Sequence, residues 1–243
     1  MNSSPGIYFD IGKKARDVLY KDYAQLSPLH FQYQCFKYNC KLSCHVGEVL
    51  PGLGTLFRVI IPDSGKAELR YLHEYAGIAA GVGLKPNPTG GCDAIADFSG
   101  ALGSDLFSIG TNISFDISTR TFNNLDTGLS LNTAFLTASL TLDDKFDTLK
   151  ASCYHSFNPL SKTAVAAEFW HSFSTNTTGV ALGTQHALWP FTLVKARVDS
   201  SWKIGTLVRQ ELWQRFFIAI AGEVDFMAIN KLSKLGFSVG FNL

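Results

Sequence analysis

Four residues around position 40 carry side chains that can bind metal ions: Cys35, Cys40, Cys44 and His45. Structural zinc sites usually begin with two cysteines separated by two residues, and the gaps here do not fit that spacing. We therefore expect no metal site. The five cysteines are an odd number without the spacing of a disulfide framework, which favours a compartment that keeps thiols reduced.

Motifs of nucleophilic, phosphate-binding or metal-dependent catalysis are missing from the sequence. It contains no G-x-S-x-G, no P-loop and no H-E-x-x-H. The six histidines are scattered, and neither they nor the acidic residues recur at a spacing that demands catalysis. The sequence therefore predicts a protein that is not an enzyme and needs no cofactor.

Cationic residues gather near the N-terminus, on a segment with the periodicity of an amphipathic helix. Within residues 5–22 the apolar residues recur at helical spacing and share one side of a helix. These apolar residues are Ile7, Ile11, Ala15, Val18 and Leu19. The cations Lys13, Lys14, Arg16 and Lys21 fall mostly on the other sides, where they form either a solvated face or a surface that attracts anions.

The composition is unusual for a soluble protein and excludes several classes. Charged residues are only 17% of the 243 residues, aromatic residues are 13%, and the formal net charge is +1. A chain this close to neutral is not expected to bind nucleic acid as a specific ligand. No stretch reaches the roughly 18 to 20 consecutive apolar residues that a membrane-spanning helix requires. A membrane β-barrel instead consists of segments of about 10 residues that alternate in polarity.

Alternation of this kind begins near residue 40 and continues to the end of the chain. In residues 105–116 and 136–143, large apolar side chains alternate with small or polar ones, as strands between lipid and water do. The same pattern is present in 66–73, 163–173 and 215–225. We expect turns near 62–65, 86–88, 123–124, 158–159, 176–177 and 199–200. Short turns between successive strands predict an antiparallel meander.

A soluble β-sandwich would show the same alternation, so the number of strands decides between the two. About 15 consecutive strands are not expected to remain an open sheet, whereas a closed barrel removes both edges. The inner face of so wide a barrel encloses water, which allows charged side chains to lie opposite Phe and Ile. The pattern therefore predicts a transmembrane barrel.

The chain's opening, PGIYFDIGKKARDVLYKDY over residues 5–23, closely resembles the N-terminal helix of mitochondrial porins, the voltage-dependent anion channel family, and its plant branch in particular. Similar blocks follow in the same order within residues 64–77, 132–154 and 183–198, so that the resemblance covers about 5–23 and 51–243. It implies an all-β fold: a transmembrane antiparallel β-barrel of about 15–19 strands with the N-terminal amphipathic helix in the lumen. We accordingly divide the chain into a helix at 1–23 and a barrel at 24–243.

Three departures from the family pattern limit what the resemblance implies. The family's Gly-Leu-Lys corresponds to Gly52, Leu53 and Gly54, so its cation is missing and nucleotide contact there is not carried over. Trp189 stands where the family usually has an acidic residue. The part of the barrel at 24–50 is divergent and short, which implies that about two to four of the family's 19 strands are lost.

The end of the chain resembles the sorting signal of mitochondrial barrels, which alternates polar, glycine and hydrophobic positions in the last strand. Lys234, Gly236, Val239 and Phe241 occupy those positions. The resemblance therefore implies an integral protein of the mitochondrial outer membrane. A final amphipathic strand without a sorting role would have the same pattern.

By resemblance, the expected function is a voltage-dependent, anion-selective channel for diffusion of small hydrophilic metabolites. The expected partners are membrane lipid, anionic metabolites in transit (ATP and ADP, phosphate, organic anions) and further copies of the chain in a homo-oligomer. Cations lining the pore would set ion preference. We expect this role for Lys13, Lys14, Arg16, Lys21, Lys66, Arg70, Lys195 and Arg197. The alternative is a shortened barrel of reduced conductance that acts as a structural or interaction protein.

Overall fold

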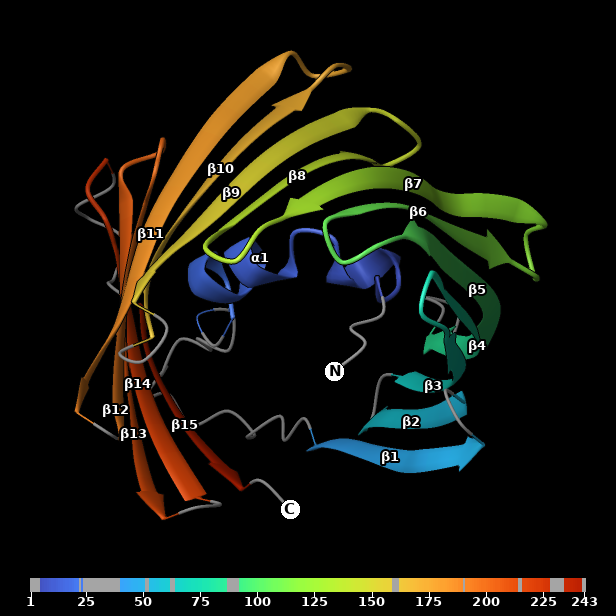
Figure 1. Ribbon diagram of the computed structural model, residues 1–243, viewed down its shortest axis with the longest axis horizontal. Helices are drawn as coiled ribbons and strands as arrows, with labels where there is room; N and C mark the ends of the chain where they lie inside the picture. The colour runs from blue at the N-terminus through green and yellow to red at the C-terminus, as the bar shows by residue number, and fades with distance from the viewer. Residues whose placement is uncertain are drawn as a thin grey trace. The chain divides into compact units, whose positions relative to one another are not determined.

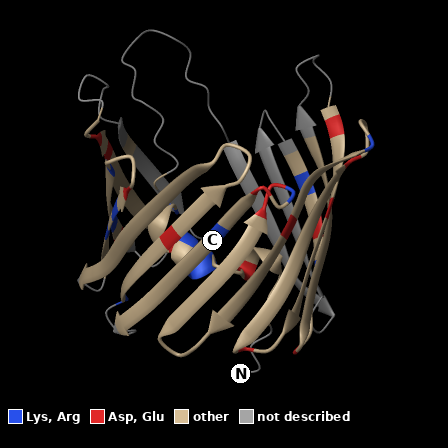
Figure 2. Ribbon diagram, turned by 90° about the horizontal axis from the view of Figure 1, so that it is seen from above, with Lys and Arg blue, Asp and Glu red and all other residues tan. Residues whose placement is uncertain are grey.

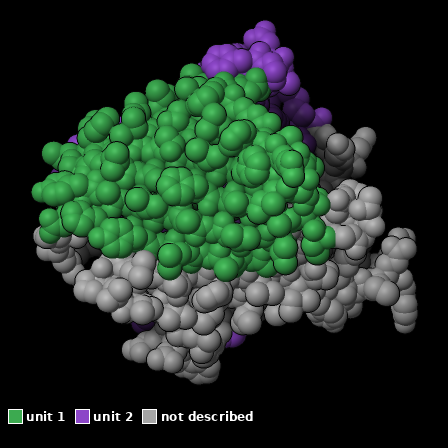
Figure 3. Space-filling model, turned by 90° about the vertical axis from the view of Figure 1, so that its right-hand side faces the viewer, with its two compact units in different colours: residues 1–11, 34–132, 139–149 green, residues 12–33, 133–138, 150–243 purple. Residues whose placement is uncertain are grey.

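The computed structural model describes residues 5–21, 23, 40–50, 53–61, 64–86, 92–158, 162–189, 191–213, 216–227 and 234–241. The chain forms two compact units (Figure 3). Unit 1 comprises residues 1–11, 34–132 and 139–149, and unit 2 comprises residues 12–33, 133–138 and 150–243. Cys35, one of the four residues considered and rejected as metal ligands, lies outside the described residues, as do the side chains of Cys40, Cys44 and His45.

The described residues form fifteen strands that follow one another in sequence order in one sheet (Figure 1). In unit 1 the registers of β1 to β7 are antiparallel throughout, and so are those of β10 to β15 in unit 2. The predicted meander is confirmed. The strands are β1 Cys40–Leu50, β2 Leu53–Ile61, β3 Ser64–Leu72, β4 Ala76–Pro86, β5 Cys92–Gly103, β6 Phe107–Asp116, β7 Thr121–Asn132, β8 Leu136–Asp143, β9 Thr148–Asn158, β10 Thr163–Ser172, β11 Thr177–Trp189, β12 Thr192–Asp199, β13 Lys203–Trp213, β14 Phe216–Asp225 and β15 Lys234–Phe241.

Alternate residues of these strands lie on two chemically different faces, as predicted. In β6, Phe107, Ile109 and Thr111 are exposed, whereas Ser108, Gly110 and Asn112, which alternate with them, are buried. We call the face that carries the exposed, large apolar side chains the apolar face, and the opposite one the polar face. Figure 2 shows that charged residues occupy few positions along the described strands.

One predicted turn is wrong. Asn123 and Asn124 lie within β7, and the chain turns earlier, at residues 117–120. The carboxylate of Asp116 fixes this turn, because its Oδ1 accepts hydrogen bonds from the backbone N–H groups of Ser118 (2.8 Å) and Thr119 (3.0 Å). Aspartate and asparagine both favour turns by bonding the backbone two residues on, and here Asp116 makes that contact.

The predicted helix over residues 5–22 is interrupted. A 3-10 helix, η1 at Tyr8–Asp10, is followed by the α-helix α1 at Lys13–Leu19. The break is at Gly12, whose φ of 67° lies in the left-handed region that glycine adopts without steric cost. Within the described part of the chain, no helix has the length and hydropathy to span a membrane.

The apolar residues of the N-terminal segment are among the most completely buried in the protein. In unit 1, η1 lies against β5 and β6, and in unit 2 α1 lies against β10, β11 and β12. The buried hydrophobic residues of the segment are Ile7, Tyr8, Ile11, Ala15, Val18, Leu19 and Tyr23. The predicted apolar stripe is thus confirmed, and it packs on the polar face of the strands.

Glycine on the polar face makes this packing possible. A Cβ atom added to Gly183 of β11 would lie 2.7 Å from Cδ2 of Leu19, and one added to Gly110 of β6 would lie 3.1 Å from Cδ1 of Ile11. At Gly77 of β4 an added Cβ would collide with the backbone carbonyl of Gly6. The strands therefore provide hollows into which the N-terminal side chains fit.

We predict that Gly183→Ala destabilises the folded protein by about 1 to 3 kcal/mol, because the added methyl group overpacks the contact with Leu19. The matched control is Gly65→Ala, since a Cβ at Gly65 has no atom within 4 Å. Denaturant unfolding in detergent, followed by tryptophan fluorescence, measures both. Equal stability of the two variants would mean that α1 does not depend on this hollow.

Candidate functional site

In unit 2, helix α1 packs on small residues of the neighbouring strands. Ala15, Val18 and Leu19 of α1 form one buried cluster with Ala166 of β10 and Ala181 of β11. Since small residues let the helix approach the strands closely, its charged side chains are held near the polar face. This contact positions the candidate site.

Two cations of β12 bind the C-terminal end of α1. Nζ of Lys195 donates a hydrogen bond to the backbone carbonyl of Asp17 (2.7 Å), and Nη1 of Arg197 donates one to the carbonyl of Leu19 (3.2 Å). The last carbonyls of a helix have no partner within it and carry a partial negative charge. Lys195 and Arg197 therefore satisfy these carbonyls and attach the helix to the strand.

Arg197 also joins the residues that follow the helix. Its Nη2 donates to Oε2 of Glu223 on β14 (2.6 Å), and its guanidinium carbon lies 5.6 Å and 4.9 Å from the ring centroids of Tyr20 and Tyr23. Both distances are those of cation–π contacts. The hydroxyl of Tyr20 donates to Oε1 of Glu168 on β10 (2.7 Å).

Both phenols stay neutral under physiological conditions. Burial, followed by the hydrogen bond to Glu168, raises the pKa of Tyr20 above its ordinary value. Burial likewise raises the pKa of Tyr23 to about 12, although Arg197 acts in the opposite direction. The two rings therefore contribute apolar contact area and no negative charge to the end of the helix.

A polar cavity of about 250 Å³ lies between α1 and strands β11 to β13. We call it the helix cavity; its lining is Lys14, Asp17, Val18, Lys21, Tyr154, Gln185, Leu193, Lys195 and Arg209. Four of these side chains are cationic and one is acidic. An excess of cations in a confined space favours carboxylate or phosphate groups.

The structure brings together only some of the predicted pore-lining residues. Lys14, Lys21 and Lys195 line the helix cavity, and Arg197 lies at the end of the helix. Lys13 and Arg16 are also on α1 but are absent from the cavity's lining, and Lys13 is exposed. Whether any of these residues lines a conducting pore stays a prediction.

Lys66 and Arg70 have a different setting, on β3 of unit 1. Nζ of Lys66 lies 2.7 Å from Oδ2 of Asp97 and 3.3 Å from Oε2 of Glu68, and Arg70 also pairs with Glu68. These two cations and two carboxylates sum to zero charge, which weakens their attraction for a passing anion. Phe9 of the N-terminal segment adds a cation–π contact at 6.0 Å from Nζ of Lys66.

The two units differ in charge. Unit 1 contains 8 Lys and Arg residues against 13 Asp and Glu residues, whereas unit 2 contains 13 against 7. The helix cavity thus belongs to the basic unit. The net charge of the whole sequence is only +1, so it does not reveal this difference between the units.

The predicted sorting residues Lys234, Gly236, Val239 and Phe241 all lie on β15, which pairs with β14. Gly236 is buried opposite Ala221. The side chains of the other three are outside the described part of the structure. Their sorting role stays a prediction.

Sequence reasoning missed several residues of the site. Arg209 lines the helix cavity, Glu168 accepts a hydrogen bond from Tyr20, and Glu223 accepts one from Arg197. Arg209 could have been found from the alternation of residues 203–213, which places it on the polar face with Gly205 and Leu207. The contact of Glu223 needed the strand registers and that of Glu168 needed the docking of the helix, because their partners are far away in sequence.

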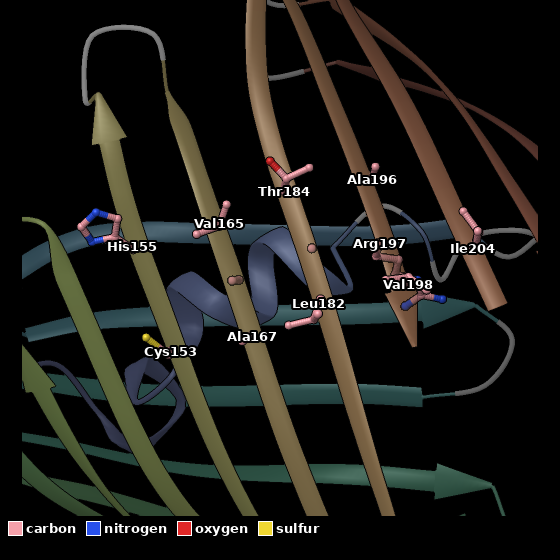
Figure 4. Close-up of a pocket in the computed structure, with 12 residues that line it drawn as sticks. Cys153, His155, Val165, Ala167, Leu182, Thr184, Ala196, Arg197, Val198 and Ile204 are labelled. Atoms are coloured by element: carbon pink, nitrogen blue, oxygen red, sulfur yellow. The ribbon is translucent and has the colours of Figure 1, made fainter. Parts of the chain in front are cut away.

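The apolar face carries hollows of its own. In unit 2 a cavity of about 490 Å³ opens across β9 to β13, on the side of the strands away from α1 (Figure 4). Val165, Leu182, Ala196 and Ile204 are among its lining residues, and nearly all of its surface is apolar. Apolar surface of this extent is typical of a face that meets lipid.

Comparison with known proteins finds one family. A family model described as eukaryotic porin matches residues 36–236. "Mitochondrial outer membrane protein porin of 36 kDa" of Solanum tuberosum is 39% identical over 278 positions, covering 98% of this chain and 99% of the relative. "Mitochondrial outer membrane protein porin 1" of Arabidopsis thaliana is 38% identical with the same coverage, and "Outer plastidial membrane protein porin" of Pisum sativum is 37% identical, again with the same coverage.

These alignments also show where length differs. They span 278 positions whereas the chain has 243 residues, so each contains gaps of at least 35 positions in this chain. Since a strand of this sheet has 8 to 13 residues, the gaps correspond to about three or four strands. This agrees with the predicted loss of strands relative to the family.

Solved structures of bacterial porins have the same fold. A mutant of the Rh. blastica porin has a TM-score of 0.52 at 9% identity, covering 76% of this chain and 92% of that chain. A triple mutant of the Rhodopseudomonas blastica porin gives a TM-score of 0.50 at 10% identity with the same coverage. At such low identity the likeness shows the fold alone, that of the porin β-barrels, and it confirms the predicted fold class.

We predict that Arg197→Met loosens the C-terminal end of α1 and costs about 2 to 4 kcal/mol, because it removes the cation that contacts Glu223 and the donor to the carbonyl of Leu19. In Glu223→Gln, Arg197 still donates its hydrogen bond to the carbonyl of Leu19, so the loss of stability is smaller. The double variant should cost less than the sum of the two single ones, because they share one interaction. Denaturant unfolding in detergent measures all three, and strictly additive values would contradict the coupling.

Proposed function

Because this chain belongs to the eukaryotic porin family, we propose that it is an anion-selective pore of the mitochondrial outer membrane, through which small hydrophilic metabolites diffuse. Like the proteins it resembles, it is a channel and not an enzyme. The expected solutes are adenine nucleotides, phosphate and organic anions. The observation that carries the anion preference is the helix cavity, with its four cations and one carboxylate.

The membrane setting is supported by the aromatic residues at the strand ends. Exposed aromatic side chains occupy turns at both ends of the strands: Tyr75, Phe135 and Phe191 after odd-numbered strands, and Phe146, Phe173, Trp202 and Phe226 after even-numbered ones. Membrane barrels carry such girdles where the strands leave the hydrocarbon for the lipid headgroups. Between the girdles the apolar face would meet lipid.

The mitochondrial assignment follows most of the relatives named above, although the relative from Pisum sativum is named for the plastid outer membrane. The residues on β15 that resemble the mitochondrial sorting signal support the mitochondrial outer membrane. Import of the radiolabelled chain into isolated plant mitochondria and chloroplasts would separate the two. Protease-protected insertion into chloroplasts alone would contradict the assignment.

Voltage dependence would come from the charges of the N-terminal segment. Lys13, Lys14 and Arg16 outnumber Asp17 on α1, and Lys21 follows the helix, so displacement of the segment moves net positive charge. The attachments of Lys195 and Arg197 to the helix carbonyls would oppose that displacement. We therefore infer that these contacts set how readily the channel closes.

A second candidate function rests on the gaps in the alignments. A barrel with fewer strands has a narrower lumen, and a helix packed inside it would obstruct a larger share of the opening. The chain would then act as a structural or interaction protein of low conductance. The buried N-terminal segment is compatible with either function, and conductance decides between them.

We predict that the refolded protein forms anion-selective channels in planar bilayers, and that the double variant Lys14→Gln, Lys21→Gln lowers the chloride-to-potassium permeability ratio by about two- to threefold, since two of the cavity's cations are lost. Lys145→Gln, in the exposed turn after β8, is the control for the loss of a distant cation. Reversal potentials in a KCl gradient give the ratio. Folded protein that shows no voltage-dependent conductance would overturn the proposal.

Deletion of residues 1–23 distinguishes the two candidate functions. For a channel, the full-length chain conducts, and the deletion variant has unstable currents with weaker voltage dependence because the buried segment is gone. For an obstructed barrel, the full-length chain conducts very little and the deletion raises conductance. Single-channel recording of both proteins, with circular dichroism to confirm folding, measures the difference.

A further inference from the structure

A second polar cavity adjoins the helix cavity in unit 2. It has a volume of about 240 Å³, and we call it the strand-end cavity because it lies where β11 ends and β12 begins. It is lined by Lys162, Ala187, Phe191, Thr192, Leu193, Arg209 and Glu211. Two cations against one carboxylate leave it with a net positive charge.

Leu193 and Arg209 line both cavities. The two residues are directly opposed in the register of β12 with β13, which explains why they share both linings. Of this pair only Arg209 is charged. The guanidinium group therefore borders both cavities.

Contacts within unit 2 hold the Arg209 side chain in this place. Its guanidinium carbon lies 3.9 Å from the ring centroid of Phe217 on β14, a close cation–π stacking distance. Nη2 lies 3.4 Å from Oε1 of Glu211, on the same face of β13. Stacking on the ring fixes the plane of the guanidinium, and the carboxylate of Glu211, which is exposed to water, offsets only part of its charge.

Arg209 lines both polar cavities, whereas Arg197 lines neither. Arg197 donates to the carbonyl of Leu19 and to the carboxylate of Glu223, so its role is to hold the helix. Lys195 lines the helix cavity but also donates to the carbonyl of Asp17. Arg197 and Arg209 thus have separate tasks.

We propose that Arg209 is a specificity-determining residue for anion passage, because it offers a passing carboxylate or phosphate group a fixed positive charge in both cavities. The inference rests on the proposed function and adds to it the residue that links the two cavities. An anion in the helix cavity meets Lys14, Lys21 and Arg209. In the strand-end cavity it meets Arg209 and Lys162, so that positive charge is continuous along the path.

The test is the chloride-to-potassium permeability ratio from reversal potentials of the full-length protein in planar bilayers. Arg209→Gln should lower the ratio by about twofold, because one cation of each cavity is lost. Arg209→Lys, which keeps the charge, should retain most of the wild-type preference. Lys162→Gln should also lower the ratio, because it removes the other cation of the strand-end cavity. It serves as a second variant, at an exposed position in the turn before β10.

The matched control is Lys203→Gln. Lys203 is on the same strand and face as Arg209 but lines neither polar cavity. A ratio unchanged in Arg209→Gln, or lowered as much in Lys203→Gln, would overturn the inference while leaving an anion-selective wild-type channel intact. A wild-type protein without anion preference would overturn the proposed function, and this inference with it. Unfolding in detergent tells a loss of stability from a change in selectivity.

Discussion

The contact between the N-terminal segment and the polar face of the strands is the interaction on which the rest of this structure depends. Exposed apolar side chains cover one face of the strands, and the other face is mostly small or polar, so the sheet buries little apolar surface of its own. The segment supplies that surface through Ile11, Val18 and Leu19. Because hydrophobic burial scales with the area removed from water, these few side chains account for much of the internal packing.

This contact also fixes the electrostatics of the site. Leu19 fits against Gly183, and the helix end is attached by Lys195 and Arg197, so Lys14 and Lys21 are brought to the cations of β12 and β13. Cations so close together repel one another, and the carbonyls at the helix end and the carboxylate of Glu223 offset part of that repulsion. A bound anion would offset more of it, so the site favours negatively charged solutes. The same residues thus serve packing and function, which makes their separate effects measurable only by paired variants.

The sequence was sufficient for the fold class because that class depends on local patterns. Alternation with a period of two identified β6, β8 and β10, and the amphipathic spacing identified the buried side of the N-terminal segment. Errors arose where a single local contact decides the backbone. Asp116 makes the turn before β7 and left Asn123 and Asn124 in a strand, and Gly12 divides the predicted helix in two.

What the sequence by itself determined is therefore the set of strands, their two faces and the presence of cations on one of them. Only the tertiary structure decided which cations act together. Arg197 and Arg209 look equivalent in sequence, yet one binds the helix end and the other lies between two cavities. The physical reason is that strand pairing and helix docking join residues up to 178 positions apart, such as Lys195 and Asp17. No periodicity within a strand contains that information, because it records only which face a side chain occupies.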